Sequence, residues 1–450
     1  MTSISVSGLV SGLNTTQIIS SIMAAAAIPQ QQLQSQLATQ QQTVAAYQQI
    51  ATGLSTLNND TTSLASSGPA WQAVVATSSS PALTATAVAG AATGSYTLSV
   101  TQLAQAQSTV SGTSVALTDT TAFSTGSFTI ANAAGATVAT VTPSDGSLSS
   151  VVSAINAANA GVTAAAVQTS SGAYRLMVTA NQTGAAGAFS ISGLTAPGGL
   201  STLTAAQDAQ VSMGSGATTL TASSSTNTFT GFVPGVTFTA SAVASNVALN
   251  VSADSSAITK SVAAMVGDAN SVLSTIGTDI AYNAASKTGG PLLGDMVTQQ
   301  LQQNLLATVS GSALGAQLAQ YGISINSTGA MTFAPATFTA AYQSNPSGAQ
   351  QAIGAFASAL GQVVTQATDP ANGSITMAVQ GVNSRISDLN ASIANWSVLL
   401  AQQKTSLQQQ YTNLEMVMSQ LKAQSSWLTA QSGAASGGSS SFSSSTTSGG

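Results

Sequence analysis

The chain has 450 residues, of which only 4% are charged, and its formal net charge is −5. That length predicts two to four domains, and six basic residues are too few for a surface that neutralises nucleic-acid phosphates. Because the chain has neither cysteine nor histidine, thiol catalysis, imidazole catalysis and the usual zinc sites are excluded. We expect no secretory signal peptide and no membrane span, since no leader-like or sufficiently long apolar segment is visible.

The N-terminal part predicts two helices. The first covers residues 15–28, with Asn14 or Thr15 as its cap and an apolar face that includes Ile18 and Ile22. Pro29 is expected to interrupt it. A glutamine-rich helix follows, with apolar residues at mostly three- and four-residue steps, and it ends at the "SSGP" of residues 66–69.

The composition changes at Trp71, and residues 71–251 are rich in Thr, Ser, Val, Ala and Gly. Short alternating runs such as "YTLSV" (96–100), "YRLMVT" (174–179) and "VALNVS" (247–252) predict a β region of sandwich or barrel type. One helix is expected inside it, at residues 148–160.

Helical patterns return near Asp254. We expect helices at 258–283 and at 295–311, the latter capped by Asp295, then a hairpin at 321–333 and one or two helices within 336–368. A long helix is predicted from about Ile375 to Thr429. The Ser/Gly-rich residues after Gln431 have the composition of a disordered tail.

The strongest pattern lies in the long helix, where seven large aliphatic residues stand seven apart: Ile386, Ile393, Leu400, Leu407, Leu414, Leu421 and Leu428. Three residues after each of the first six come Leu389, Trp396, Gln403, Gln410, Val417 and Gln424, so the companion stripe is half polar. Two interpretations stay open. The helix is an ordinary bundle helix, or it meets the N-terminal helices along one stripe and other subunits, reversibly, along the other.

The remaining motifs have plain structural interpretations. The "GLVSG" of residues 8–12 is expected to be a flexible lead-in, because outside an apolar span it carries no membrane meaning. The scattered aspartates mostly stand at turn or cap signals, so we predict no catalytic carboxylate pair, no metal site and no cofactor, and we expect the chain not to be an enzyme.

The two ends of the chain resemble a known family. The stretch "ISVSGLVSGLNTTQIISSIMAAAAIPQQQLQSQLATQQQTVAAYQQIATGLSTL" is similar to the N-terminus of the flagellar filament cap proteins, the hook-associated protein 2 family. The landmarks are a turn at 11–14, an amphipathic helix at 18–23, a proline break at 26–29 and the pair Ala46–Tyr47. Asn14 and Ala27 depart from the family pattern, where Asp and Glu are usual.

Further matches follow in order. Residues 147–191 resemble a small β-α-β repeat shared by cap, junction and flagellin proteins. "GGPLLGDM" (289–296), "YGISINSTGAMTF" (321–333) and "YTNLEMVMSQLKAQSSWLTAQ" (411–431) resemble the C-terminal region of the cap family. The similarity covers most of the chain except roughly 192–228 and the tail.

The resemblance implies an α+β multidomain fold in which N- and C-terminal helices form a coiled-coil or helical-bundle leg, with β-rich, sandwich- or barrel-like head domains inserted. The expected parts are N-terminal leg helices (1–67), a β head (68–112 with 217–253), a nested β head with the β-α-β motif at 147–191 (113–216), a C-terminal bundle and leg (254–431) and a disordered tail (432–450). The heptad residues of the long helix, with Leu33, Leu37, Val44 and Leu54, would form the leg seam; Gln403, Gln410, Ile18 and Ile22 would face flagellin.

For function, the resemblance implies a structural cap at the distal, extracellular tip of the bacterial flagellum that promotes folding and polymerisation of exported flagellin and prevents its loss. The implied partners are further copies of the chain, five in an assembled cap, together with flagellin and the hook–filament junction proteins. An export chaperone would bind the C-terminal helix, and the chain would leave the cell through the flagellar type III pathway without a cleaved signal peptide.

Other classes remain as alternatives at this point. A hook–filament junction protein or a flagellin-like subunit would share the helical ends. A cell-surface adhesin would share the Ser/Thr-rich β region, and a cap protein also acts as an adhesin in some members of this family. An adhesin that was not a cap would need a signal peptide or a membrane anchor. An enzyme is the weakest alternative, because the residues offer no catalytic set.

Overall fold

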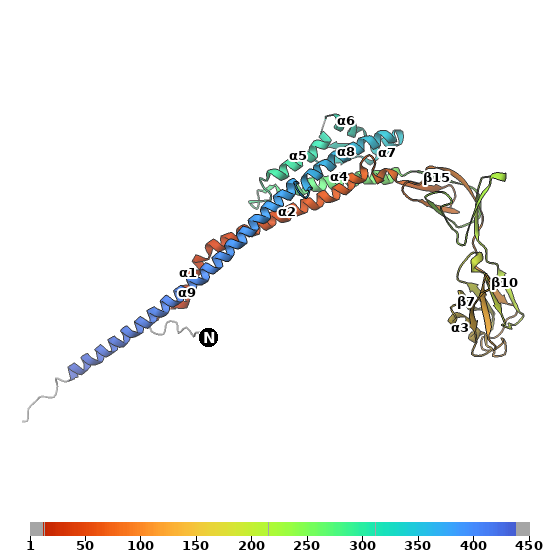
Figure 1. Cartoon of the computed structure of the whole chain (residues 1–450), viewed down its shortest axis with the longest axis horizontal. Helices are drawn as coiled ribbons and strands as arrows, with labels where there is room; N and C mark the ends of the chain where they lie inside the picture. The colour runs from red at the N-terminus through yellow and green to blue at the C-terminus, as the bar shows by residue number, and fades with distance from the viewer. Residues whose placement is uncertain (1–11, 13, 215, 311, 438–450) are drawn as a thin grey trace, which may run out of the picture.

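The computed structural model describes residues 12, 14–214, 216–310 and 312–437. The molecule is elongated, with a helical leg at one end, a helical body in the middle and two successive β regions at the other end (Figure 1). The "GLVSG" lead-in, apart from Gly12, and residues 438–450 of the expected tail lie outside the described residues.

The N-terminal helices are α1 (Thr15–Ala26) and α2 (Ile28–Leu64). The Asn14 Oδ1 atom accepts a 3.0 Å hydrogen bond from the Gln17 backbone N–H and so caps α1. Pro29 lies in the first turn of α2, where its missing N–H costs no helical hydrogen bond. A single residue, Ala27, therefore separates the two helices.

The long C-terminal helix is α9 (Ser374–Gly437), and it lies against α1 and α2 (Figure 1). Its beginning matches the prediction, but its end does not. The expected tail begins at Ser432, whereas the helix continues to Gly437. Serine and glycine are weak helix formers, so composition alone underestimates a helix that is already propagating through its preceding turns.

The body is built from α4 (Ser255–Asp279), α5 (Met296–Ser310), α6 (Ser312–Gln320), α7 (Pro335–Ser344) and α8 (Pro346–Thr368), with hairpins β16 (Tyr282–Asn283)/β17 (Thr288–Gly289) and β18 (Ile323–Ile325)/β19 (Met331–Phe333). Its core holds fully buried side chains of α2, among them Ile50, Leu54 and Leu57, beside Met265 of α4 and Phe356 of α8. The second half of α2 is thus a body helix, which corrects the expectation that residues 1–67 belong to the leg alone.

We call the β region next to the body the near head. A five-stranded antiparallel sheet has the order β1-β15-β3-β11-β12, and a three-stranded sheet has the order β13-β14-β2. The bounds are β1 (Val74–Ser78), β2 (Leu83–Ala87), β3 (Gly94–Gln102), β11 (Ala209–Met213), β12 (Leu220–Ser224), β13 (Thr228–Thr230), β14 (Val236–Ala240) and β15 (Ala244–Ala253). Both sheets share one core, in which Leu98 and Leu249 pack near Phe238. Short 3-10 turns occur at η1 (Pro69–Gln72), η2 (Ala185–Gly187) and η3 (Gly216–Thr218).

The β region beyond it is the far head. Its sheets have the orders β10-β4-β8-β7 and β6-β5-β9, and α3 packs into their common core. The bounds are β4 (Ser108–Ser111), β5 (Phe128–Asn132), β6 (Thr137–Val141), α3 (Leu148–Ala157), β7 (Val162–Ser170), β8 (Ala173–Ala180), β9 (Phe189–Ser192) and β10 (Leu200–Thr204). Successive side chains of β8 point to opposite faces of the sheet, and Leu176, Val178 and Ala180 are on the face that is buried in the core.

Two details of the heads differ from the expectations. The chain passes between the heads where Gln105 and Gln207 exchange backbone hydrogen bonds of 2.9 and 3.2 Å. With the expected boundaries at 112/113 and 216/217, β4 would belong to the near head and β11 to the far head, whereas β4 lies in a far-head sheet and β11 in a near-head sheet. Residues 147–191 contain α3, then the antiparallel hairpin β7–β8, while β6 before α3 belongs to the other sheet. The segment is therefore not a β-α-β unit with both strands in one sheet.

Candidate assembly interface

We call leg the part formed by α1, residues 28–45 of α2 and α9 from residue 386. Gln30 fixes its register, because the Gln30 Nε2 atom donates to the Ser397 Oγ atom at 2.7 Å and to the Ile393 carbonyl oxygen at 3.4 Å. Since α2 runs towards the body and α9 runs away from it, the two helices are antiparallel (Figure 1). The leg is thus held mainly by apolar packing and amide hydrogen bonds.

The predicted seam residues of α9 divide into two groups. Ile386, Ile393, Leu400 and Leu407 are half-buried. In contrast, the exposed fractions of Leu414, Leu421 and Leu428 are 44%, 54% and 61%. The first four heptads face the N-terminal helices, and the last three extend beyond them.

The predicted seam residues of the N-terminal helices also divide. Leu33, Leu37 and Val44 are half-buried and lie in the leg half of α2. Leu54 is fully buried, but it lies in the body core and does not belong to the leg seam. The structure therefore brings Leu54 together with α4 and α8 side chains instead of with the heptad residues past Leu400.

The first four positions of the companion stripe of α9 follow their polarity, whereas the apolar Val417 is 51% exposed. Leu389 and Trp396 are half-buried, whereas Gln403 and Gln410 are exposed. Beyond Leu407 the half-buried positions become Tyr411 and Glu415, each four residues on. A straight α-helix drifts by about 20° per heptad relative to a strict seven-residue repeat, so the contact face leaves the heptad positions after a few turns.

The face of α1 that is buried within the chain differs from the face, with Ile18 and Ile22, that was expected to contact flagellin. Thr15 and Ile19 are buried, Ile18 is half-buried, and Ile22 is exposed at 36%. The i, i+4 spacing of Thr15 and Ile19 was the available signal. Ile22 therefore stays free for a contact outside the chain, whereas Ile18 is partly covered.

Within the described residues, the distal part of α9 has no neighbouring helix (Figure 1). Its exposed large apolar residues are Leu414, Val417, Met418, Leu421 and Leu428 along one side, which we call the distal face, and Met416 and Trp427 on the opposite side. Such a concentration of exposed apolar side chains marks a protein–protein contact surface, because monomeric proteins rarely leave one uncovered. This distal face is the main candidate assembly interface.

The joint between α2 and α5 was not found by sequence reasoning. The Tyr47 Oη atom donates to the Asp295 Oδ2 atom at 2.6 Å, and the Asp295 Oδ1 atom caps α5 by accepting the Thr298 N–H at 2.8 Å. Burial, and next the hydrogen bond to Asp295, raise the pKa of Tyr47 above its ordinary value. The phenol therefore stays protonated and remains a donor at every physiological pH.

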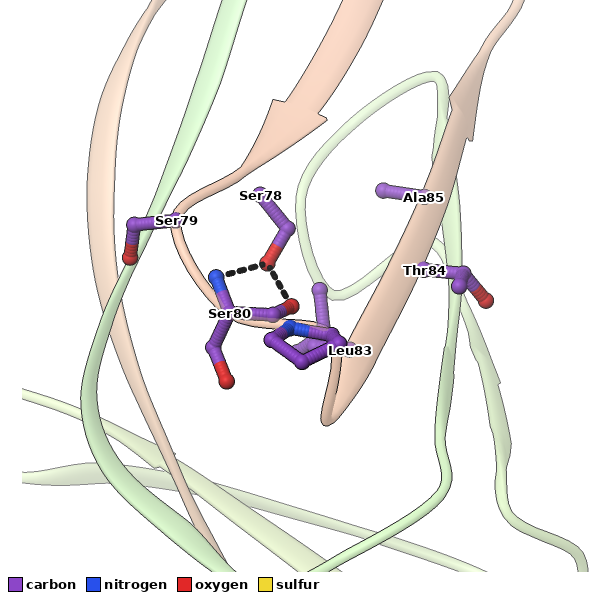
Figure 2. Close-up of a pocket in the computed structure, with 7 residues that line it drawn as sticks. Ser78, Ser79, Ser80, Leu83, Thr84 and Ala85 are labelled. Carbon is purple, nitrogen blue, oxygen red and sulfur yellow. Dashed lines mark hydrogen bonds between the residues drawn. The ribbon is translucent and has the colours of Figure 1, made fainter.

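Three depressions on the described residues are lined without any titratable side chain. One of them, a shallow depression of about 380 Å³, lies at the β1–β2 turn, and its lining includes Ser78, Ser80 and Leu83 (Figure 2). There the Ser78 Oγ atom donates to the Ser80 carbonyl at 2.9 Å and accepts from the Ser80 N–H at 3.2 Å, so this hydroxyl stabilises the turn. Within the described ranges, no cluster of acidic side chains could hold a metal ion, and no helix has the length and apolarity to cross a bilayer.

Two family models match the sequence. The model described as flagellar hook-associated protein 2 N-terminus matches residues 11–107, and that described as flagellar hook-associated protein 2 C-terminus matches residues 206–423. Together they cover well over half of the chain. No curated protein matches the sequence.

Solved structures match as well. The D1-D2-D3 domains of the flagellar cap protein FliD from Escherichia coli are 29% identical, with a TM-score of 0.53, over 75% of this chain and 99% of that one. The D2-D3 domains of the E. coli protein are 30% identical over 40% and 100% of the chains, with a TM-score of 0.36. FliD from Pseudomonas aeruginosa is 20% identical over 43% and 94%, with a TM-score of 0.35. Of the three, the first supports a shared fold.

The fold consists of a helical leg, a helical body and two inserted β heads. The E. coli cap structure matches three quarters of the chain, so this fold defines the class of flagellar cap proteins. Both terminal models point to one family within that class. The chain belongs to the flagellar hook-associated protein 2 family.

Proposed function

We propose that the chain caps the growing flagellar filament at its distal, extracellular end, where it promotes folding and polymerisation of exported flagellin and prevents its loss. Filament capping follows from membership of the family and from the likeness to the E. coli cap protein. The observation that carries the mechanism is the uncovered distal face of α9, with Leu421 and Leu428 more than half exposed.

In this mechanism the heads of several copies form a plate over the filament end, and the legs reach into the lattice of flagellin subunits. Exposed Gln403, Gln410 and Ile22 lie on the outside of the leg. Uncharged amides exchange hydrogen-bond partners at little cost, which suits a leg that must release one flagellin neighbour and bind the next. Few charges also avoid the desolvation cost of burying ions at each step.

The finer assignments belong to the same proposal. The assembled cap contains five copies, and its base contacts the hook–filament junction proteins before the filament elongates. An export chaperone covers the distal α9 face before secretion, because that face is apolar and would otherwise promote aggregation. The chain is exported through the flagellar type III pathway and performs no catalysis.

Deletion of the gene tests the function. The deletion strain is expected to secrete flagellin monomers into the medium, to lack filaments and to be non-motile, and the intact gene supplied in trans should restore all three. Full-length filaments on the deletion strain would refute the capping function. Retention of flagellin inside the cell would point instead to an export defect.

A further inference from the structure

Two aspartates face each other across the packing of α2 against α4. On α2 the stripe towards α4 contains Gly53, Leu57, Asp60 and Leu64; on α4 the stripe towards α2 contains Met265, Asp268, Val272 and Ile276. The stripes are in close contact, since a Cβ atom built on Gly53 would lie 2.9 Å from the Val272 Cγ2 atom. Asp60 and Asp268, both half-buried, lie on these two facing stripes, where most of the neighbouring positions are apolar.

The surroundings leave one carboxyl oxygen without a donor. The Asp60 Oδ2 atom is buried and accepts no hydrogen bond from an N–H or hydroxyl group of the described residues. Burial, a hydrogen bond with the Asp268 carboxyl group and the charge of Asp268, in that order, raise the pKa of Asp60 to about 6. A single proton held between the two carboxyl groups supplies the missing donor, whereas two ionised groups repel each other.

No cation of the neighbouring elements stands beside the pair. α4 itself carries Lys260 and Asp279, and Lys260 is eight residues from Asp268, about 12 Å along the helix axis. Other titratable or charged groups are Tyr47 on α2, Tyr342 on α7, and Arg385, Asp388, Lys404, Tyr411, Glu415 and Lys422 on α9. The register between Gln30 and Ser397 places Arg385 beside about residue 42, roughly 27 Å along α2 from Asp60. α1, α5, α8, β19 and η1 carry no titratable side chain.

We propose that Asp60 and Asp268 form a proton-sharing carboxyl pair that makes the α2–α4 joint tighter in mildly acidic medium than at neutral pH. The folded chain holds a proton there that the unfolded chain releases. Stability therefore falls as the pH rises from the ordinary aspartate value of 3.8 to about 6 and stays at the lower level above it. α2 continues from this joint into the leg. The external pH therefore changes, through the pair, the stability of the attachment between the leg and the body.

Thermal unfolding of the full-length monomer at pH 5 and pH 7.5 tests the proposal. The wild type should melt several degrees higher at pH 5. Asp60→Asn and Asp268→Asn retain the shape and a hydrogen bond without the charge, so each should lose most of this difference and melt above the wild type at pH 7.5. Asp388→Asn, on the exposed surface of α9, is the matched control and should keep the wild-type difference.

An unchanged difference between the two pH values in both interface variants would overturn the proposal. A direct measurement covers the case in which a variant fails to fold. The carboxyl carbons of the wild type, followed by NMR between pH 3 and pH 8, should show one group at this joint that titrates near pH 6. Titration of both Asp60 and Asp268 near the ordinary value of 3.8 would exclude a shared proton.

Discussion

Tyr47 and Asp295 are joined by a 2.6 Å hydrogen bond although 248 residues separate them in sequence. The bond ties the middle of α2 to the N-cap residue of α5. The Thr43 hydroxyl lies at the same joint, where its one hydrogen is shared between the Thr39 carbonyl oxygen at 3.1 Å and the Pro291 carbonyl oxygen at 3.2 Å. Asp295 serves two helices at once, because its other oxygen caps α5. These contacts hold α2 against the start of α5 at the point where α2 passes from the body into the leg.

Removal of the phenol tests this joint. Tyr47→Phe keeps the ring but loses the donor, so unfolding should become easier by about 1.5–3 kcal/mol, the usual range for a hydrogen bond to a charged group. Asp295→Ala should cost more, since it also removes the α5 cap. Denaturant unfolding of the monomer measures both. A Tyr47→Phe variant as stable as the wild type would show that the bond contributes nothing net.

Local patterns were sufficient for most helices and strands. Asn14, Asp254 and Asp295 act as the caps of α1, α4 and α5. The α+β architecture with a helical leg and inserted β heads, predicted from the terminal motifs, is confirmed. These features depend on residues close in sequence, which is why propensity and capping signals reveal them.

The rest depends on contacts between distant residues. The Tyr47–Asp295 bond, the Asp60–Asp268 pair and the exchange of hydrogen bonds between Gln105 and Gln207 leave no local signal. The heptad pattern was also a poor guide to partners, because equal spacing describes Leu400, which is half-buried, and Leu421, which is exposed. Spacing shows which residues share a face but not what covers that face.

Gly354 on α8 offers a test of packing against helix propensity. Glycine inside a helix usually costs about 1 kcal/mol relative to alanine. Here, however, an added Cβ atom would lie 3.0 Å from the backbone N and Cα atoms of Ser66 and 2.5 Å from its Oγ atom. Gly354→Ala should therefore destabilise the body by about 1–3 kcal/mol, as overpacking does.

The matched control is Gly267→Ala on α4, where no atom lies within 4 Å of the new Cβ. That change should stabilise the chain by about 0.5–1 kcal/mol. Chemical denaturation of both variants gives the comparison. Stabilisation by both substitutions would mean that α8 and the chain around Ser66 are not in close contact.

Two truncations separate the leg from the body. A chain of residues 41–399 lacks the distal leg but keeps Tyr47, Ile50 and Leu54 in the body core, so it should fold and yet fail to restore filaments in a deletion strain. A chain that begins at Gly68 loses the whole α2 contribution to the core and should not fold its body. Circular dichroism melts and motility assays distinguish the two. Normal filaments from residues 41–399 would contradict the role of the leg.

Amide exchange in the full-length monomer reports the same division. Residues 15–40 of the N-terminal helices and 400–433 of α9 should exchange fast, because a helix pair with little else to pack on is marginally stable. Residues 46–64 should be protected, since Tyr47, Ile50 and Leu64 lie in the body core. Equal protection along all of α2 in a verified monomer would mean that the leg is rigid before assembly.

Aspartate substitutions at two heptad positions of α9 that differ in solvent exposure test the seam. Leu407→Asp brings a carboxylate to a half-buried position beside α1, so it should loosen the leg of the monomer by about 1–3 kcal/mol. Leu414 is 44% exposed, so Leu414→Asp should leave the monomer nearly unchanged but abolish filaments, because the distal face is then charged where it must be covered in the assembly. Gln403→Ala and Gln410→Ala, on the exposed companion stripe, are the matched controls and should alter filament length only. Swimming, filament length and monomer melting at matched expression measure all four variants, and equal tolerance of Leu414→Asp and Gln410→Ala would show that the distal face makes no contact in the cap.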